Sequence, residues 1–369
     1  YGDWSSDVCS SDLFKITKRQ AQEFNNYQKR FKEFSAPGAA IIRDQPWKEG
    51  DLFSQTQLAN TLILIAKNGR DGFYKGPVAD YIVAEMNRGK GLISLEDLEN
   101  YQAVWRKPIV GEYKDFTIIS MPPSSSGGTA LLALLQSVEK YPLSEWGFQS
   151  DSTIRAMVEA ERRIYADRAT HLGDPEFYNV PVEYLTDKKL NQERMAKVSL
   201  QKATPSSEVK AAKFPGYESE ETTHFSIVDK DGNAVSLTTT LNGSYGSGVW
   251  VDGAGFLLNN EMDDFSAKPG SPNIYGLLGG KANSIQPGKR MLSAMTPTIV
   301  EQNGQLKMVI GTPGGSTIIT SVFQGILNVL EFGMSAQESV DAPRFHHQWQ
   351  PDRIDVETDA ISEEVRKSL

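Results

Sequence analysis

Residues 221–233 read ETTHFSIVDKDGN, and after Glu221 two threonines stand in front of a short alternating strand. Asp231-Gly232 is a dipeptide typical of a tight turn between antiparallel strands, and Ala234–Leu241 follows as the returning strand. The preceding residues, 201–221, are polar, contain two prolines and lack periodicity. The sequence therefore predicts a linker that leads into Thr222, with a β-hairpin directly behind it.

The threonine pair has a chemical interpretation and a plainer one. A threonine hydroxyl needs a nearby base to act as a nucleophile. Its own α-amino group, with a pKa of about 7.7–8.0, can be that base if the residue is the first of a chain. Because Thr222 lies inside the chain, the peptide bond between Glu221 and Thr222 would have to be cut first. Threonines also simply favour strands, so on the pair alone the plainer interpretation stays open.

The composition is that of an ordinary globular protein. The chain has 369 residues, 39% hydrophobic and 23% charged, which is enough for one large domain or two smaller ones. A net charge of −9 with no basic cluster argues against a nucleic-acid partner, and no apolar run is long enough to span a bilayer.

Cys9 is the single cysteine, so no intrachain disulfide can form. Residues 1–13 repeat Ser-Ser-Asp without periodicity, and we interpret them as a foreign tail.

Helical periodicity dominates the chain from Phe14 to about Leu200, and strands dominate it after the linker. The first part is expected to contain helices at 55–68, 129–141 and 152–172, a capping box at Ser94 and Asp97, one strand at 112–120 and a Pro/Gly/Ser loop at 121–128. The second part is expected to add a hairpin of 298–300 with 306–310 and a helix at about 316–332. This order predicts an α+β fold in which the layers share one core.

Polar residues gather at two strand ends in the second part. Thr240 and Asn242 fall near the end of the returning strand, where a hydroxyl and an amide can hydrogen-bond the nucleophile. The apolar run of GFLLNNEMDDFS, residues 255–266, stops at a group of acids that includes Glu261 and Asp264. Such carboxylates can bind a substrate ammonium, although a solvated acidic turn explains them equally well. Their spacing lacks the calcium-binding EF-hand pattern.

Two glycine-rich segments follow. KPGSPNIYGLLGG, residues 268–280, can form a mobile lid that carries Tyr275, or a plain surface loop. GTPGGS, residues 311–316, stands between a strand and a helix, where backbone N–H groups can hold a developing oxyanion. It lacks the Lys-Ser/Thr ending of a phosphate-binding loop. His346-His347 and His171 show no metal-ligand spacing, and no GxSxG motif is present.

Taken together, these stretches resemble one family, gamma-glutamyltranspeptidase. The motifs are DGFYKG (71–76), MPPSSSGG (121–128), TTHFSIVDKDGNAV (222–235), LNNEMDDFSAKPG (258–270), MLSAMTPTIV (291–300), GTPGGS (311–316) and DAPRFHHQW (341–349). The resemblance runs from about residue 15 to the end of the chain. It implies a four-layer αββα sandwich of the N-terminal-nucleophile hydrolase type, with no metal or organic cofactor.

The resemblance also implies a maturation step and a location. Cleavage before Thr222 would divide one precursor into a large-subunit region, of which residues 14–221 are the C-terminal part, and a small-subunit region, residues 222–369, that is truncated at its C-terminus. Both would form one folded domain. Family members of bacteria are typically periplasmic or secreted, so the same location is expected here.

Carried over by position, the resemblance assigns roles to nine residues. Thr222 would be the nucleophile and its freed amine the base, supported by a hydrogen bond from Thr240. The N–H groups of Gly314 and Gly315 would form the oxyanion hole. The other residues would bind the γ-glutamyl donor: Asn242, Glu261 and Asp264 at its α-amino group, Ser293 at its α-carboxylate, and Tyr275 on a lid over the pocket.

The implied reaction is acyl transfer from glutathione or another γ-glutamyl amide to water, an amino acid or a peptide.

Two departures from the family pattern concern the donor's carboxylate. Ala294 replaces a second serine, which removes a hydrogen bond worth about 1–3 kcal/mol of binding. The family's carboxylate-binding arginine lies upstream of where this chain begins, so the chain is expected to be a fragment.

Three alternatives stay open from the sequence. A related acylase would cleave a glutaryl or similar side chain from a β-lactam nucleus, but such a donor lacks the ammonium that Glu261 and Asp264 would bind. A non-catalytic binding protein of the same fold would remain uncut. A metal-dependent hydrolase would use the acidic turn with the histidines.

Overall fold

The computed structural model describes residues 13–209 and 223–369, and its chain divides into two compact units. The first unit comprises Tyr1–Trp105 with Tyr245–Asn260, and the second comprises Arg106–Ser244 with Glu261–Leu369. Helices and strands are mixed along the chain, which confirms the expected α+β class. The expected division at residue 221 into two regions of one folded domain stays a prediction.

The first unit is built from five helices of 4 to 17 residues and two short strand pairs among the described residues. Its elements are β1 (Leu13–Lys15), α2 (Lys18–Phe34), β2 (Leu52–Ser54), α3 (Thr56–Asn68), α4 (Asp71–Tyr74), α5 (Pro77–Gly89), α6 (Leu95–Asn100), β7 (Trp250–Val251) and β8 (Phe256–Leu257). The expected capping box is confirmed: Ser94 Oγ accepts from the Asp97 N–H, and Asp97 Oδ2 accepts from the Ser94 N–H. Gly69 ends α3 with a φ of +57°, as expected for a helix stop.

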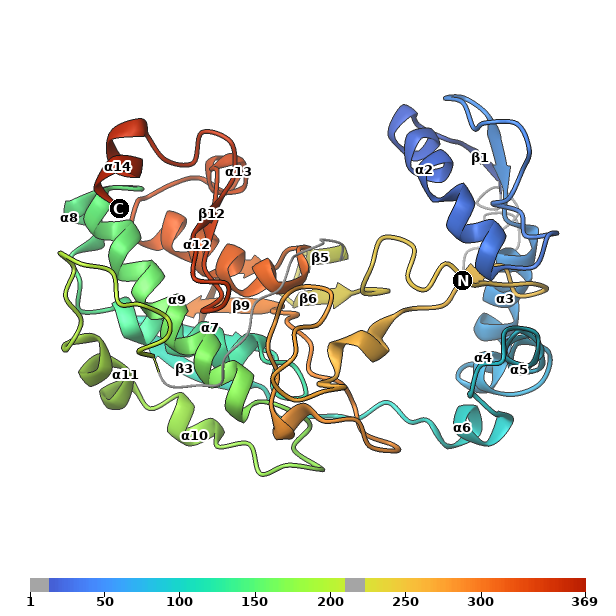
Figure 1. Ribbon diagram of the computed structural model, residues 1–369, viewed down its shortest axis with the longest axis horizontal. Helices are drawn as coiled ribbons and strands as arrows, with labels where there is room; N and C mark the ends of the chain where they lie inside the picture. The colour runs from blue at the N-terminus through green and yellow to red at the C-terminus, as the bar shows by residue number, and fades with distance from the viewer. Residues whose placement is uncertain (1–12, 210–222) are drawn as a thin grey trace. The chain divides into compact units, whose positions relative to one another are not determined.

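The second unit contains the main sheet and the longest helix, α9 (Asp151–His171; Figure 1). Its strands are β3 (Ile109–Tyr113), β4 (Phe116–Ser120), β5 (Thr223–Val228), β6 (Ala234–Thr239), β9 (Thr298–Gln302), β10 (Gln305–Ile310), β11 (Phe345–His346) and β12 (Asp355–Val356). Its helices are α7 (Gly127–Val138), α8 (Leu143–Trp146), α9 (Asp151–His171), α10 (Val182–Leu185), α11 (Lys188–Met195), α12 (Ile318–Leu330), α13 (Ala336–Asp341) and α14 (Glu363–Ser368). Three 3₁₀ turns complete it: η1 (Glu261–Asp264), η2 (Lys281–Asn283) and η3 (Gly315–Thr317).

The main sheet of this unit is antiparallel, in the order β10-β9-β4-β3. The single strand expected at 112–120 is wrong, because the chain reverses at Lys114 and Asp115 and forms the hairpin β3–β4. Lys114 takes a φ of +51°, which a lysine rarely adopts and which carried no sequence signal. The second expected hairpin is confirmed as β9–β10, with both Asn303 and Gly304 at positive φ, as a type I′ turn requires.

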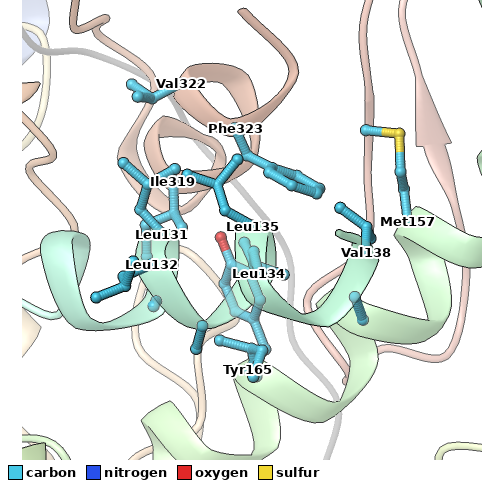
Figure 2. Close-up of a cluster of buried hydrophobic side chains, with 14 of the residues drawn as sticks. Leu131, Leu132, Leu134, Leu135, Val138, Met157, Tyr165, Ile319, Val322 and Phe323 are labelled. Carbon is cyan, nitrogen blue, oxygen red and sulfur yellow. The ribbon is translucent and has the colours of Figure 1, made fainter. Parts of the chain in front are cut away.

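Helix α7 forms the centre of the core. All of its residues, Gly127–Val138, are buried, and the helix packs against β3, β4, α9 and α12. Figure 2 shows Leu131 and Leu135 on the side of Ile319 and Phe323 of α12, and Leu134 beside Tyr165 of α9. Burying each leucine contributes about 1.5–3 kcal/mol, so this cluster fixes α9 and α12 against one another. Each of the two helices contributes a residue to the lining of the cavity described below: Arg168 from α9 and Ile318 from α12.

The expected hairpin around Asp231-Gly232 is confirmed as β5–β6, in which Thr223 pairs with Thr239 and Val228 with Ala234, and Gly232 takes a φ of +84°. The hairpin lies against β10, because Ser226 Oγ donates to the Val309 carbonyl at 3.1 Å and Ser236 Oγ to the Ile310 carbonyl at 3.1 Å. Its register places the start of β5 beside the end of β6. The residues that follow β6 therefore leave the sheet next to the residue at which β5 begins.

Candidate active site

A cavity in the second unit brings together residues from segments that are far apart in the sequence. It is lined by Arg168, Thr240, Asn242, Asp264, Tyr275, Leu277, Leu292, Ser293, Ala294, Met295, Gly315 and Ile318. Six of the nine expected site residues are in this set: Thr240, Asn242, Asp264, Tyr275, Ser293 and Gly315. Gly314 adjoins Gly315, whereas Glu261 lies in the η1 turn and does not line the cavity. Thr222 lies outside the described residues.

The end of the β5–β6 hairpin supplies Thr240 and Asn242. The Asn242 N–H donates to Thr240 Oγ1 at 2.8 Å, which closes a tight turn behind β6. Asn242 is buried and takes a φ of +72°, a conformation that asparagine tolerates better than most residues. Its carbonyl accepts from the Tyr275 hydroxyl at 2.6 Å. Both residues line the cavity, and the Tyr275 hydroxyl holds the backbone of the turn.

Tyr275 is more enclosed than a residue on a lid loop needs to be. Its side chain is 4% exposed, and its carbonyl accepts from Gln348 Nε2 at 3.1 Å. The neighbouring Ile274 N–H donates to Asp263 Oδ2 at 2.5 Å. These contacts fix residues 268–280 to the acidic turn, so the loop forms a wall of the cavity in this structure.

The acidic turn contributes Asp264. Burial raises the pKa of Asp264 to about 7, the positive charge of Arg168 lowers it, and a hydrogen bond from the Asn242 side chain lowers it further. Burial also raises the pKa of Glu261 to about 7. Near neutral pH these two carboxyl groups therefore bind protons until a positive charge comes close. A substrate ammonium would supply that charge.

The serine loop at 121–128 supports the opposite wall. Ser126 Oγ and the Ser126 N–H both donate to the Ser293 carbonyl, at 2.7 and 2.9 Å. Ser293 Oγ donates to Ser125 Oγ at 2.8 Å, and Ser125 Oγ donates to the Met295 carbonyl at 2.7 Å. A Cβ at Gly127 would lie 2.2 Å from the Met295 carbonyl oxygen, so only glycine permits this approach. The loop fixes Ser293 at the cavity wall.

The glycine turn follows β10 and precedes η3 and α12. Gly314 and Gly315 take φ values of +138° and +53°, which side chains other than glycine rarely allow. The Tyr165 hydroxyl donates to the Ser316 carbonyl at 2.6 Å and thereby fixes the next residue. Backbone N–H groups of such a turn before a helix can stabilise a negatively charged oxygen.

Arg168 is the site residue that sequence reasoning missed. It lines the cavity from α9, is 4% exposed, and donates from Nε to Ser126 Oγ at 2.9 Å. A signal was present, because Glu161, Tyr165 and Arg168 follow Ile154 at helical spacing on one face of α9, and all four are buried. A charged residue on the buried face of a helix indicates a side chain that is paired or functional. The other charged residues of α9 made this spacing hard to recognise in the sequence.

The polar stretch before Thr222 is partly anchored. Ser206 is fully buried, its N–H donates to Asp352 Oδ2 at 2.8 Å, and its carbonyl accepts from Trp349 Nε1 at 3.0 Å. Arg162 forms an ion pair with the same aspartate. Within the part of the chain that the structure describes, no group of three or more His, Cys, Asp or Glu side chains could hold a metal ion.

Comparisons with known proteins agree on one family. The family model described as gamma-glutamyltranspeptidase matches residues 10–369. The glutathione hydrolase proenzyme of Escherichia coli (strain K12) is 49% identical over 85% of this chain and 54% of its own length. The acylase ACY 1 proenzyme of Pseudomonas sp. (strain V22) is 36% identical over 90% of this chain and 57% of its own length.

A solved structure shows the same fold. The crystal structure of cephalosporin acylase from Bacillus halodurans superposes with a TM-score of 0.81 at 23% identity, over 97% of this chain and 63% of that one. The chain thus spans little more than half the length of the curated relatives named above. No helix among the described residues is long and apolar enough to cross a membrane.

Proposed function

Because the chain belongs to the gamma-glutamyltranspeptidase family and has the α+β fold of N-terminal-nucleophile hydrolases, we propose that the full-length protein cleaves γ-glutamyl amides such as glutathione. The reaction passes through a threonyl ester and ends in hydrolysis or in transfer to an amino acid or peptide. The protein is first cut between Glu221 and Thr222 by its own chemistry, which yields a large and a small subunit.

The first half of the reaction forms the ester. The Thr222 hydroxyl attacks the γ-carbonyl carbon, and the freed α-amino group of the same residue takes the hydroxyl proton. Negative charge develops on the carbonyl oxygen and is stabilised by the N–H groups of Gly314 and Gly315. The C–N bond then breaks, and the leaving amine takes the proton from the α-amino group. The β5–β6 register supports this arrangement. Thr223 pairs with Thr239, so one further pair in the same register would join the residue before Thr223 to Thr240.

The second half releases the glutamyl group. Water or an acceptor amine attacks the ester, gives a proton to the α-amino group of Thr222 and expels the threonine oxygen, which takes the proton back. The same glycine turn stabilises the second oxyanion, so one constellation serves both steps.

Donor recognition uses the two charged ends of the glutamyl group. Asp264, with Asn242 beside it, binds the α-ammonium, and Glu261 adds negative charge from the same turn. Ser293 donates to the α-carboxylate, and Tyr275 closes the wall. A charge-assisted hydrogen bond to a buried carboxylate is worth about 1.5–3 kcal/mol, enough to favour α-amino donors strongly.

One observation carries the proposal. Chain segments around residues 240, 264, 275, 293 and 315, which the family resemblance assigns to one active site, line a single cavity. The test uses the full-length protein and its Thr222→Ala variant, compared by intact mass and by release of p-nitroaniline from γ-glutamyl-p-nitroanilide. The parent should give two chains and turn over, and the variant should give one chain and no turnover.

Two outcomes would refute this function. A parent protein that hydrolyses the donor while the bond before Thr222 stays whole would contradict the amine's role as base. A parent protein that is cut but inactive on γ-glutamyl donors would contradict the substrate.

A second candidate, acylase activity, is favoured by the 36% identity to the acylase ACY 1 proenzyme. Glutaryl-p-nitroanilide separates the two functions, because it lacks the ammonium that Asp264 would bind. We expect the γ-glutamyl donor to be preferred by at least about 100-fold, the factor that corresponds to about 3 kcal/mol. A preference for the glutaryl donor would identify an acylase.

The proposed location is the periplasm or the exterior of the cell, as the family resemblance implies. Fractionation of cells that express the complete gene tests it, with activity expected outside the cytoplasm.

A further inference from the structure

Arg168 is a buried cation that forms no ion pair with any other residue that the structure describes. Its neighbour on the same helix, Arg162, is equally buried but forms ion pairs with Asp352 and Glu159. Among the described residues no carboxylate lies within ion-pair distance of Arg168. A buried guanidinium without a close counter-ion costs free energy, so its position at a cavity wall calls for an electrostatic explanation.

The contacts of Arg168 lead to both ends of the proposed donor site. In one direction, Nε donates to Ser126 Oγ at 2.9 Å, and Ser126 Oγ donates to the Ser293 carbonyl at 2.7 Å. In the other direction, Arg168 and Asp264 line the same cavity and a second, adjoining one. Their charges interact across this space: each shifts the pKa of the other toward the ionised form.

We propose that Arg168 is a positioning residue of the donor site, whose charge favours the carboxylate form of Asp264 that binds the donor's ammonium and whose hydrogen bond to Ser126 braces the segment that carries Ser293. This inference rests on the proposed function and adds to it the residue that sets the site's electrostatics. It assigns that role to α9, from which none of the expected site residues comes.

The other groups around Asp264 act against or beside Arg168. Glu261 and Asp263, from the same turn, raise the pKa of Asp264 by repulsion. Asn242 hydrogen-bonds its side chain, and Asn273 Nδ2 lies 3.4 Å from Oδ1. Arg168 supplies the cation among these groups. Its removal therefore leaves Asp264 with burial and two negative neighbours, so the pKa of Asp264 must rise.

The test is the pH profile of kcat/KM in the full-length protein. Asp264 binds the ammonium only when ionised, so the acidic limb of the profile for γ-glutamyl-p-nitroanilide should move to higher pH in Arg168→Gln by about one unit. Arg168→Lys keeps the positive charge, so the acidic limb of its pH profile should coincide with that of the parent protein. Its KM should rise, because the hydrogen bond from Arg168 Nε to Ser126 Oγ is lost. Arg168→Met replaces Arg168→Gln if the latter does not fold.

Glutaryl-p-nitroanilide is the matched control substrate. It carries no ammonium, so its acidic limb should coincide in the parent protein and in Arg168→Gln, since the Thr222 amine titrates alike in both. Arg162→Gln is the matched control variant: it removes an equally buried guanidinium of α9 from outside the cavity and should lower stability without moving either limb.

The outcomes separate the two proposals. If the parent protein does not cleave γ-glutamyl donors, the proposed function is wrong. If it does, but the limb of the neutral Arg168 variants stays in place, or moves equally with the glutaryl donor, the role assigned to Arg168 is overturned.

Discussion

Asp264 shows how burial sets the chemistry of a single side chain. Burial raises its pKa to about 7, so near neutral pH the empty site holds a proton there in a large share of molecules. Binding of an ammonium lowers that pKa and releases the proton. In the proposed donor site this would discriminate by charge, because a neutral donor atom at the same place leaves the carboxyl protonated.

Replacement of Asp264 with asparagine tests this at the residue scale. The amide keeps the shape and loses the charge, so kcat/KM for γ-glutamyl-p-nitroanilide should fall about 100-fold, the equivalent of about 3 kcal/mol. The rate with glutaryl-p-nitroanilide should change little. Steady-state kinetics with the two donors measures both, and equal losses would mean that Asp264 acts on folding or processing instead.

At the scale of elements, the start of α7 connects the core to the site. Its leucines are fixed by α9 and α12, and its first residues touch the segment that carries Ser293. The serine loop therefore connects the packed core to the part of the cavity wall that Ser293 forms.

The Gly127→Ala variant tests this connection. The added Cβ would lie 2.2 Å from the Met295 carbonyl oxygen and 2.5 Å from Thr296 Oγ1, so backbone must move. We expect a loss of about 1–3 kcal/mol in the free energy of unfolding and a raised KM for γ-glutamyl donors. Gly147→Ala is a control on stability alone, since it is also strained, with a φ of +89°, but nothing lies within 4 Å of its Cβ. An unchanged KM in Gly127→Ala would show that the serine loop does not position Ser293.

At the scale of the whole molecule, buried titratable groups make stability depend on pH with opposing signs. Burial raises the pKa of Asp264 and Glu261 to about 7, so the folded state binds their protons more tightly and stability falls as pH rises from about 4 to about 7. Burial lowers the pKa of His347 to about 4, so the unfolded state binds that proton more tightly and stability rises between about pH 4 and 6.5.

The Asp264→Asn variant separates these contributions. Relative to the parent protein, its free energy of unfolding should grow between pH 4 and pH 8 by on the order of 3 kcal/mol, because one ionisation cost is removed. Urea unfolding at pH 4, 6 and 8 measures the difference. A difference that is constant with pH would show that the carboxyl is not buried in the folded protein.

Local features and family membership could be predicted from the amino-acid sequence without the fold. Asp231-Gly232 and Asn303-Gly304 specify their turns, Ser94 with Asp97 specifies a helix start, and seven motifs point to one family. These signals are local, since turn and cap residues act on their own backbone.

Features that depend on neighbours distant in the sequence became visible with the packing of the chain. The place of Arg168 at the cavity, the position of Glu261 outside its lining and the raised pKa of Asp264 all depend on contacts between segments that are distant in the sequence. The packing of α7, α9 and α12 against the sheet sets which side chains are buried. Burial can shift the pKa of a carboxyl group by several units from its value in water, and the residue type alone does not reveal that shift.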